Sequence, residues 1–358
     1  MALMLTLWNF PSETSESPAF DATIPVVDMN DYFKEETRDR FISKVAEALH
    51  TVGFFAVVNP GIAVEDLERG YAASMDFFLH PLEQKLECYK ASINGQRGYV
   101  PSETAQGNSV KDCKEFYHIG RKSNIWPTWM NFQEPMENLI KALDIHSEIL
   151  QIAFAKALGE NERFLIDMTE TGECLIRALH YPPNPNPSVP WAAQHTDIDL
   201  FTILPMATEE GLQVFHEGQW IDVRVPKDAF IVNGGDKLQN LSNGYFKSSL
   251  HRVVAKPGLE RFSIVYFVHP RDNDPMDPLP QAVSMTGGVK RYPEATSLEL
   301  LACRLRELGL ASPALLQFEK ESGIMERIQA LVDSGDAADP VKLTYEVWQK
   351  SQNTEEAN

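Results

Sequence analysis

A run of short apolar segments between residues 174 and 268 most constrains the fold of this 358-residue chain. We expect strands at 174–181, 199–205, 212–216, 219–223, 229–233, 247–254 and 261–268, separated by turn-forming residues. Strands at this spacing are typical of a β-sandwich or barrel, and a closed double sheet hides most of its strand edges. The sequence therefore predicts a core that is mainly β.

Helices are expected on both sides of this core. Apolar residues recur at helical spacing in 37–53, 64–79, 136–158 and 296–309, and shorter strands are expected at 22–29, 54–59 and 114–120. Turn formers predict a loop at 94–107. With no internal repeat or long linker, we expect one domain over 1–358: a helix-rich part to 170, the β core at 171–283 and a helical part at 284–358.

Composition restricts the partners. The formal net charge is −19, which argues against nucleic acid and anionic membranes, although a local pocket can still bind a small anion. The four cysteines are scattered without a CxxC pair, which is typical of reduced thiols in a cytoplasmic protein. The apolar N-terminus lacks the features of a signal peptide, and no apolar run is long enough to span a membrane.

His195 and Asp197 start a candidate metal site. They are two apart at the start of a predicted strand, where alternation would place both side chains on one face. His251, from a later strand, supplies a third donor. Two histidines and one carboxylate leave open positions that suit non-haem Fe(II), although zinc accepts the same donors and an HxD pair alone is common by chance. Asp199 is expected at the surface or beside the ligands.

Arg261 and Ser263 form a candidate carboxylate receptor. They are also two apart on a strand, and they follow His251 closely enough to predict an adjacent antiparallel strand. A guanidinium beside a hydroxyl binds carboxylates well. A dicarboxylate could then bind the metal at one end and Arg261 at the other. A surface ion pair is the alternative for Arg261.

Together these segments resemble a known family. The pieces IPVVDM, GFFAVVNPGI, RGYVP, LHYPPNP, HTDIDLFTIL, VNGGDKLQNLSNGYFKSSLHRV and RFSIVYF, in this order, are similar to the isopenicillin N synthase-like Fe(II)/2-oxoglutarate-dependent dioxygenases. The resemblance implies a double-stranded β-helix, or jelly roll, with flanking helices. It implies Fe(II), 2-oxoglutarate and O2 as cofactor and co-substrates, and oxidation of a C–H bond in a small molecule with release of succinate and CO2.

The resemblance also implies residue roles. His195, Asp197 and His251 would bind iron, and Arg261, Ser263 and Tyr181 would bind 2-oxoglutarate. Asn233 would lie in a turn beside the metal, and we expect it among the residues that bind the co-substrate. The chain departs from the family at Pro60, where a histidine is usual, and at Asp199, where a small residue is common. Candidate substrate contacts, with Arg97 indicating an anionic substrate, are Arg97, Tyr99, Tyr117, Phe201, Gln213 and Phe267.

Other functions stay open at this point. Some relatives oxidise their substrate with O2 and no 2-oxoglutarate. A non-catalytic small-molecule binder could use the same scaffold, and a zinc hydrolase is a third possibility. The primary substrate, the reaction outcome and the oligomeric state are not predicted.

Overall fold

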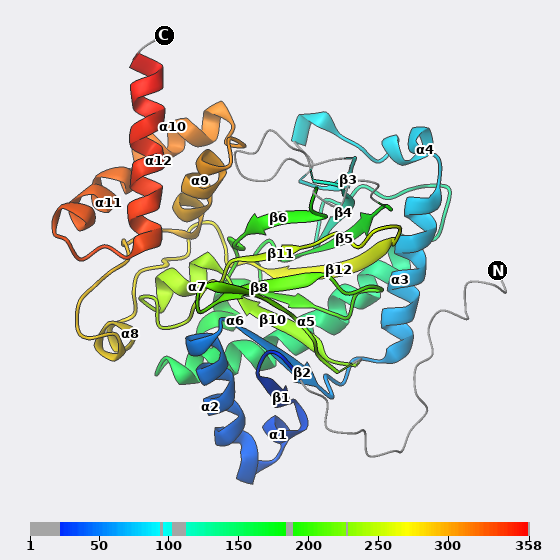
Figure 1. Cartoon of the computed structure of the whole chain (residues 1–358), viewed down its shortest axis with the longest axis horizontal. Coiled ribbons are helices and arrows are strands. Elements are labelled where there is room, and N and C mark those ends of the chain that lie inside the picture. Colours follow the sequence, from blue (N-terminus) through cyan, green and yellow to red (C-terminus); the bar gives the residue numbers. More distant parts are fainter. Residues whose placement is uncertain (1–21, 94–95, 102–111, 184–188, 227, 357–358) are drawn as a thin grey trace.

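The computed structural model describes residues 22–93, 96–101, 112–183, 189–226 and 228–356, and its centre is two facing β-sheets (Figure 1). In spatial order the larger sheet contains β1 (Val26–Asp28), β2 (Phe54–Val58), β10 (Phe230–Gly234), β7 (Phe201–Leu204), β12 (Arg261–Val268), β5 (Leu175–Tyr181), β4 (Glu115–Gly120) and β3 (Gly98–Val100). The smaller sheet contains β6 (Ala192–His195), β11 (His251–Val253), β8 (Leu212–His216) and β9 (Gln219–Asp222). One buried apolar cluster takes residues from both sheets, so their inner faces pack together. The predicted jelly-roll core with flanking helices is confirmed.

Helices flank the two sheets, and most of the first group pack against the outer face of the larger sheet. The first group is α1 (Asn30–Phe33), α2 (Glu35–Thr51), α3 (Val64–Leu79), α4 (Leu82–Leu86), the 3-10 turn η1 (Ala91–Ile93), α5 (Gln133–Ala157), α6 (Phe164–Thr169) and α7 (Asp236–Leu241). The last group is α8 (Pro280–Met285), α9 (Ser297–Glu307), α10 (Pro313–Ser322), α11 (Ile324–Asp333) and α12 (Asp339–Glu356). In Figure 1, α9 to α12 stand together at one end of the molecule, where residues of α9, α11 and α12 form a separate small core. A capping box between Thr296 and Glu299 starts α9.

Strand β12 shows how the sequence divides the larger sheet into two faces. Phe262, Ile264 and Tyr266 are buried in the large core beneath the helices. The alternate residues, including Arg261 and Ser263, face the smaller sheet and line a cavity between the two sheets. The same period of two that makes the strand amphipathic therefore brings polar groups to a single inner surface.

Several strand boundaries differ from the sequence prediction. The expected strand at 199–205 begins at Phe201, because residues 196–200 turn between β6 and β7. The strand β6 was not predicted, and the expected loop at 94–107 contains the short strand β3. In both cases the strand is only three or four residues long, too short for periodicity to identify.

The predicted pairing of the His251 and Arg261 strands is wrong. Strand β11 pairs with β6 and β8, whereas β12 pairs with β5 and β7. The intervening residues carry the chain from the smaller sheet to the larger one rather than forming a hairpin. His251 and Arg261 therefore belong to opposite walls of the cavity.

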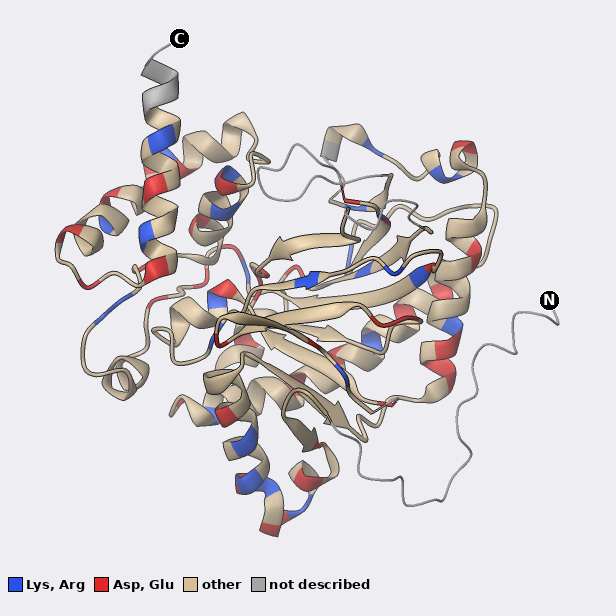
Figure 2. Ribbon diagram, viewed as in Figure 1, with Lys and Arg blue, Asp and Glu red and all other residues tan. Residues whose placement is uncertain are grey.

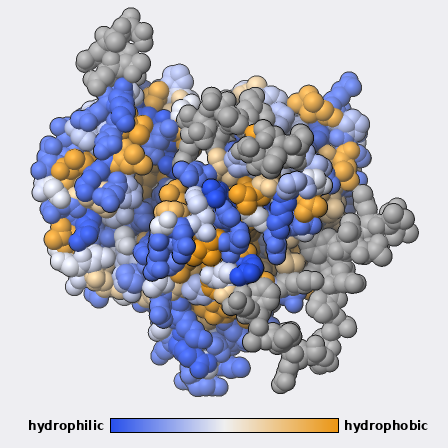
Figure 3. Space-filling view, viewed as in Figure 1, coloured by the Kyte–Doolittle hydropathy of each residue, from blue (hydrophilic) through white to orange (hydrophobic). Residues whose placement is uncertain are grey.

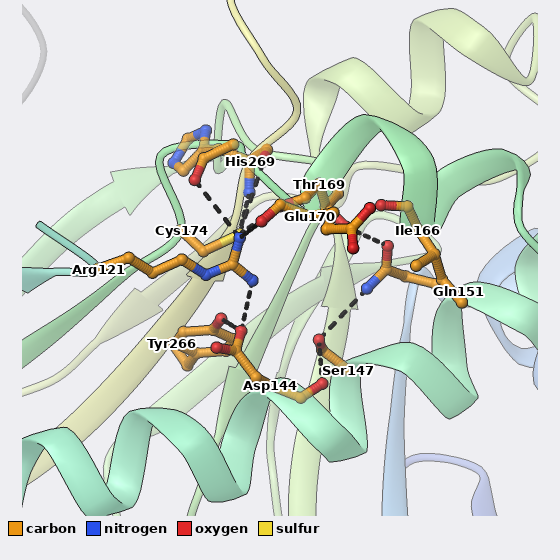
Figure 4. A network of polar contacts seen from close by, with 11 residues as sticks. Arg121, Asp144, Ser147, Gln151, Ile166, Thr169, Glu170, Cys174, Tyr266 and His269 are labelled. Atoms are coloured by element: carbon orange, nitrogen blue, oxygen red, sulfur yellow. Dashed lines mark hydrogen bonds and ion pairs between the residues drawn. The ribbon is translucent and has the colours of Figure 1, made fainter.

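A half-buried polar network joins α5 and α6 to the β core (Figure 4). The Arg121 guanidinium donates to the main-chain oxygen of Thr169 at the end of α6, and its second nitrogen lies 2.5 Å from Asp144 Oδ1 on α5. The Tyr266 hydroxyl of β12 donates to the same Asp144 oxygen. One arginine thus fixes two helices and a central strand together.

Charged residues are concentrated on the helices and loops, and the central strands carry few of them (Figure 2). The face shown in Figure 3 is largely hydrophilic, with apolar side chains in separate patches. Among the described residues, no helix combines the length and the apolar composition needed to cross a membrane.

Candidate metal centre

The cavity between the two sheets brings together most of the sequence-predicted site residues. His195, Asp197, His251, Arg261 and Ser263 all line it. Its wall also includes Tyr181, Asn233, Phe267, Thr202, Arg177 and Lys114, together with apolar residues such as Leu179, Leu204 and Val265. A small cavity that combines convergent polar groups with apolar walls is typical of a binding site for a small ligand.

Three donor groups lie close enough together to bind one ion. The Nε2 atoms of His195 and His251 are each 3.8 Å from Asp197 Oδ1, and all three donors lie within 4.8 Å of one another. Two ligand atoms about 2.1 Å from an ion can lie up to about 4.2 Å apart, so a single ion can bridge each of these two pairs. A set of two imidazoles and one carboxylate matches the preference of non-haem Fe(II).

The backbone positions these donors differently from the prediction. His195 ends β6 and pairs directly with His251 across the smaller sheet. Asp197 lies beyond β6, in the turn that leads to β7. The two residues therefore converge through this turn and not through strand alternation.

Both imidazoles are oriented with Nε2 toward the carboxylate. The Nδ1 atom of His195 hydrogen-bonds to the main-chain oxygen of Ala193 at 2.7 Å, and that of His251 approaches the oxygen of Ser249 at 3.2 Å. Burial and the neighbouring His251 lower the pKa of His195 to about 3, so its imidazole is neutral at neutral pH. A neutral imidazole whose Nδ1 carries the proton has its Nε2 lone pair available for a metal.

The carboxylate of Asp197 is fixed by two donors. The Thr202 hydroxyl donates to Oδ2 at 2.7 Å, and the Asn233 amide donates to the same oxygen at 2.9 Å. Burial raises the pKa of Asp197, but His251, His195 and these hydrogen bonds outweigh it and lower the pKa to about 2. Oδ1 is left directed at the histidines. Asn233 lies on β10 rather than in a turn, and its partner is Asp197.

Asp199 is not a surface residue, because it is fully buried directly behind this group. Burial and the nearby Asp197 raise its pKa well above the usual range. Its Oδ2 lies 3.0 Å from the Thr202 hydroxyl, which has only one proton to give. A protonated Asp199 can donate to Thr202, which then donates to Asp197. Gly235 is required here, since a Cβ at that position would lie 2.2 Å from Asp199.

The second cluster lies on the larger sheet. Arg261 and Ser263 are buried on the cavity face of β12, and one Arg261 nitrogen lies 3.1 Å from the Ser263 hydroxyl. The Nε of Arg261 donates to the main-chain oxygen of Glu209 at 2.9 Å. Tyr181 pairs with Arg261 across β5 and β12, and its ring centre is 5.0 Å from the guanidinium carbon. This arrangement fixes a cation at the end of the cavity.

Five of the six candidate substrate residues lie outside the cavity lining. Arg97 forms an ion pair with Glu173 at 2.6 Å. Gln213 of β8 hydrogen-bonds to Asp222 of β9 and to Arg252 of β11. The other three are buried in the large helical core: Tyr99, Tyr117 and Phe201. On β7 the alternate residues Thr202 and Leu204 line the cavity, so Phe201 faces away from it. Among the residues of β3 and β4, the strands of Tyr99 and Tyr117, none lines the cavity.

Phe267 is the exception, because it does line the cavity. Three other polar lining residues were not predicted from the sequence: Thr202, Arg177 and Lys114. Strand alternation could have identified two of them, because residues an even number of positions apart face the same side of a strand. Arg177 is four positions before the predicted site residue Tyr181, and Thr202 is two positions before the lining residue Leu204. Pro60 is far from these residues in sequence and lines a separate surface groove beside α3.

The fold and donor set define a non-haem iron type of jelly roll, and comparisons with known proteins agree. Residues 172–270 match the model of the 2OG-Fe(II) oxygenase superfamily, and residues 24–137 match the N-terminal model of the non-haem dioxygenase in morphine synthesis. The chain belongs to the Fe(II)/2-oxoglutarate-dependent dioxygenases. It is an enzyme of this class, with Fe(II) as its metal and 2-oxoglutarate as its co-substrate.

Three relatives illustrate the likeness. The 2-oxoglutarate-dependent dioxygenase traH of Penicillium crustosum is 32% identical over 72% of this chain and 88% of its own length. Gibberellin 2-beta-dioxygenase 8 of Arabidopsis thaliana is 31% identical over 70% of this chain and 75% of its own length. A full-length Neurospora crassa protein, solved in complex with alpha-KG and thymine, is 26% identical with a TM-score of 0.72, covering 82% of this chain and 98% of that one.

Proposed function

We propose that His195, Asp197 and His251 are the iron ligands of this dioxygenase. The observation that carries the proposal is the convergence of their three donor atoms, with both Nδ1 atoms and Asp197 Oδ2 already engaged elsewhere. Thr202 and Asn233 would keep the Asp197 carboxylate in position. When bound, Fe(II) supplies the oxidation chemistry, in which 2-oxoglutarate and O2 yield succinate, CO2 and an oxidised substrate.

Arg261 and Ser263 are proposed to hold the distal carboxylate of 2-oxoglutarate, with Tyr181 beside them. The buried guanidinium is fixed by Glu209, and the Ser263 hydroxyl lies next to it. A carboxylate at this point would receive charge-assisted hydrogen bonds, each contributing roughly 1.5–3 kcal/mol. Because Arg261 and the histidines stand on opposite sheets, a dicarboxylate can reach from one wall to the other.

The cavity walls would protect and orient the reacting groups. Leu179, Leu204, Val265 and Phe267 provide apolar surface that excludes water from the space beside the ligands. Hydroxylation of a small molecule is the expected outcome, and desaturation or ring closure follows if the substrate is held differently. The relatives compared above carry different substrate names, so none of their substrates is assigned to this chain.

Two finer points complete the proposal. The net charge of −19 disfavours nucleic acid as a partner. All four cysteines are free, which supports a reducing, cytoplasmic location that cell fractionation would test.

Release of succinate tests the function directly. The iron-loaded enzyme with 2-oxoglutarate should release succinate faster when its substrate is added, and His195→Ala should abolish this. An iron enzyme that oxidises its substrate without consuming 2-oxoglutarate would contradict the proposal. Biological activity that survives His195→Ala would instead favour a non-catalytic binding protein, and activity restored by zinc to chelated protein would favour a hydrolase.

A further inference from the structure

We propose that the primary substrate carries a carboxylate or an equivalent acidic group, and that Arg177 binds it on the side of the cavity next to Phe267. This inference rests on the proposed function, because it places a substrate beside the metal and co-substrate sites described above. It differs from the sequence expectation, in which Arg97 bound the anion. Arg97 pairs with Glu173, away from the cavity lining.

Arg177 lies at a different end of the cavity from the co-substrate receptor. It is in the middle of β5, where it pairs with Val265 of β12 and with His118 of β4. Tyr181, four residues further along the same strand, pairs with Arg261. At about 3.3 Å per residue, Arg177 is about 13 Å along the strand from the position opposite Arg261. The two arginines therefore serve separate parts of the cavity.

Aromatic rings hold the Arg177 guanidinium. Its central carbon is 4.6 Å from the ring centre of Phe116 and 5.3 Å from that of Phe267. Its Nε donates to His118 Nε2 at 2.7 Å, so His118 accepts at this nitrogen. A guanidinium with rings at these positions makes its hydrogen bonds in its own plane, which is the geometry that suits a carboxylate.

Phe267 links Arg177 to the metal centre. On β7, Thr202 pairs with Phe267, and the Thr202 hydroxyl donates to Asp197. Arg177 thus lies one aromatic side chain away from the residues that fix the metal-binding carboxylate. A molecule whose acidic group reaches Arg177 and whose body rests on Phe267 would extend toward the donor triad.

The charge of the cavity wall favours an anion. Among the described residues that line the cavity, Asp197 is the one carboxylate, whereas Lys114, Arg177 and Arg261 are cationic. Lys114 forms an ion pair with Asp112 at 2.9 Å. A small cleft with an excess of one sign of charge concentrates ligands of the opposite sign. This local excess contrasts with the net charge of −19 of the whole chain.

Matched pairs of acids and amides test the inference. The full-length enzyme, loaded with Fe(II) and 2-oxoglutarate under anaerobic conditions, would be titrated calorimetrically with benzoate, phenylacetate, cyclohexanecarboxylate and 1-naphthoate, and with the primary amide of each. We expect at least one acid to bind roughly 10-fold or more tightly than its amide, as the loss of a charge-assisted hydrogen bond predicts. Absence of acid binding at millimolar concentration, or equal binding of acids and amides, would overturn the proposal.

Three variants separate recognition from structure. Arg177→Gln should weaken binding of the preferred acid by roughly 10- to 100-fold and leave its amide unchanged, whereas Arg177→Lys should give an intermediate loss. Arg97→Gln removes a positive charge just before β3, outside the cavity lining, and should change the binding of neither ligand. Equal weakening of acid and amide in Arg177→Gln would mean that Arg177 only supports the fold.

Binding of 2-oxoglutarate distinguishes failure of this inference from failure of the proposed function. Arg177→Gln should bind 2-oxoglutarate as tightly as the unmodified enzyme. If 2-oxoglutarate binding depends on Arg261 while acids and amides bind alike, only the acidic-substrate inference fails. If 2-oxoglutarate binding does not depend on Arg261, the proposed receptor itself is wrong.

Discussion

Replacing Thr202 by valine should weaken metal binding without changing a metal ligand. Valine has nearly the shape of threonine, so the variant loses little beyond the hydroxyl. That hydroxyl lies 2.7 Å from Asp197 Oδ2 and 3.0 Å from Asp199 Oδ2. After its loss, the Asn233 amide at 2.9 Å still donates to the Asp197 carboxylate.

The magnitude follows from the type of bond. A hydrogen bond to a charged group contributes roughly 1.5–3 kcal/mol, and about 1.4 kcal/mol corresponds to a tenfold change in affinity. Because Asn233 still orients Asp197, we expect the lower part of the range, about 10- to 30-fold in metal affinity, within the usual cost of losing a ligand's partner. The buried Asp199 also loses its partner, so unfolding should become easier by about 1–3 kcal/mol.

Anaerobic competition titration with Fe(II) or Co(II) measures the first effect, and urea unfolding of the metal-free protein measures the second. Thr202→Ser keeps the hydroxyl and is the matched control, expected to bind metal like the unmodified enzyme. A Thr202→Val protein that binds metal within twofold of the unmodified enzyme would refute the reasoning, because the hydroxyl would then contribute nothing to positioning Asp197.

Four further outcomes are expected. Arg261→Gln should raise the 2-oxoglutarate concentration for half-maximal succinate release by roughly 10-fold or more, and an unchanged requirement would reject the receptor. His251→Ala should purify without iron and release no succinate, which metal analysis and a turnover assay would check. The metal-free protein should lose stability as the pH falls from about 6.5 toward 3. In this range His195 binds a proton in the unfolded chain but stays neutral in the folded protein, where its pKa is lowered to about 3. If the urea midpoint of His195→Gln changes with pH as steeply as that of the unmodified protein, this reasoning is wrong. Arg121→Met should lower the free energy of unfolding by about 1–3 kcal/mol, because it removes the charged donor from the half-buried Asp144 carboxylate, and an unchanged midpoint would contradict that role.

The periodicity of apolar residues predicted long helices and strands correctly. The helix expected at 64–79 is α3 with the same bounds, and the strand expected at 261–268 is β12 with the same bounds. Both are long and strongly periodic, so burial of one face decides their structure. Strands of three or four residues, such as β6, depend on partners that are distant in sequence, and no window of the sequence contains those partners.

The candidate site could be named from the sequence, but its arrangement could not. His195, Asp197 and His251 come together as donors, although Asp197 reaches the others from a turn. The pairing of β11 with β12 failed because nearness in sequence does not reveal whether a turn closes a hairpin or crosses between sheets. The prediction that Phe201 contacts the substrate missed the cavity lining for a related reason, because Thr202, one residue along the same strand, is the side chain that lines it.

The order of strands in the larger sheet also has a consequence for how this chain is made. Strand β2 lies between β1 and β10, and Val57 pairs with Phe230, which is 173 positions later. A ribosome therefore delivers one edge of β2 long before its partner exists. We expect the emerging first half to expose unpaired strand edges and to need protection from aggregation. The larger sheet, and the cavity between it and the smaller sheet that carries His195 and His251, would close only after synthesis has passed β12.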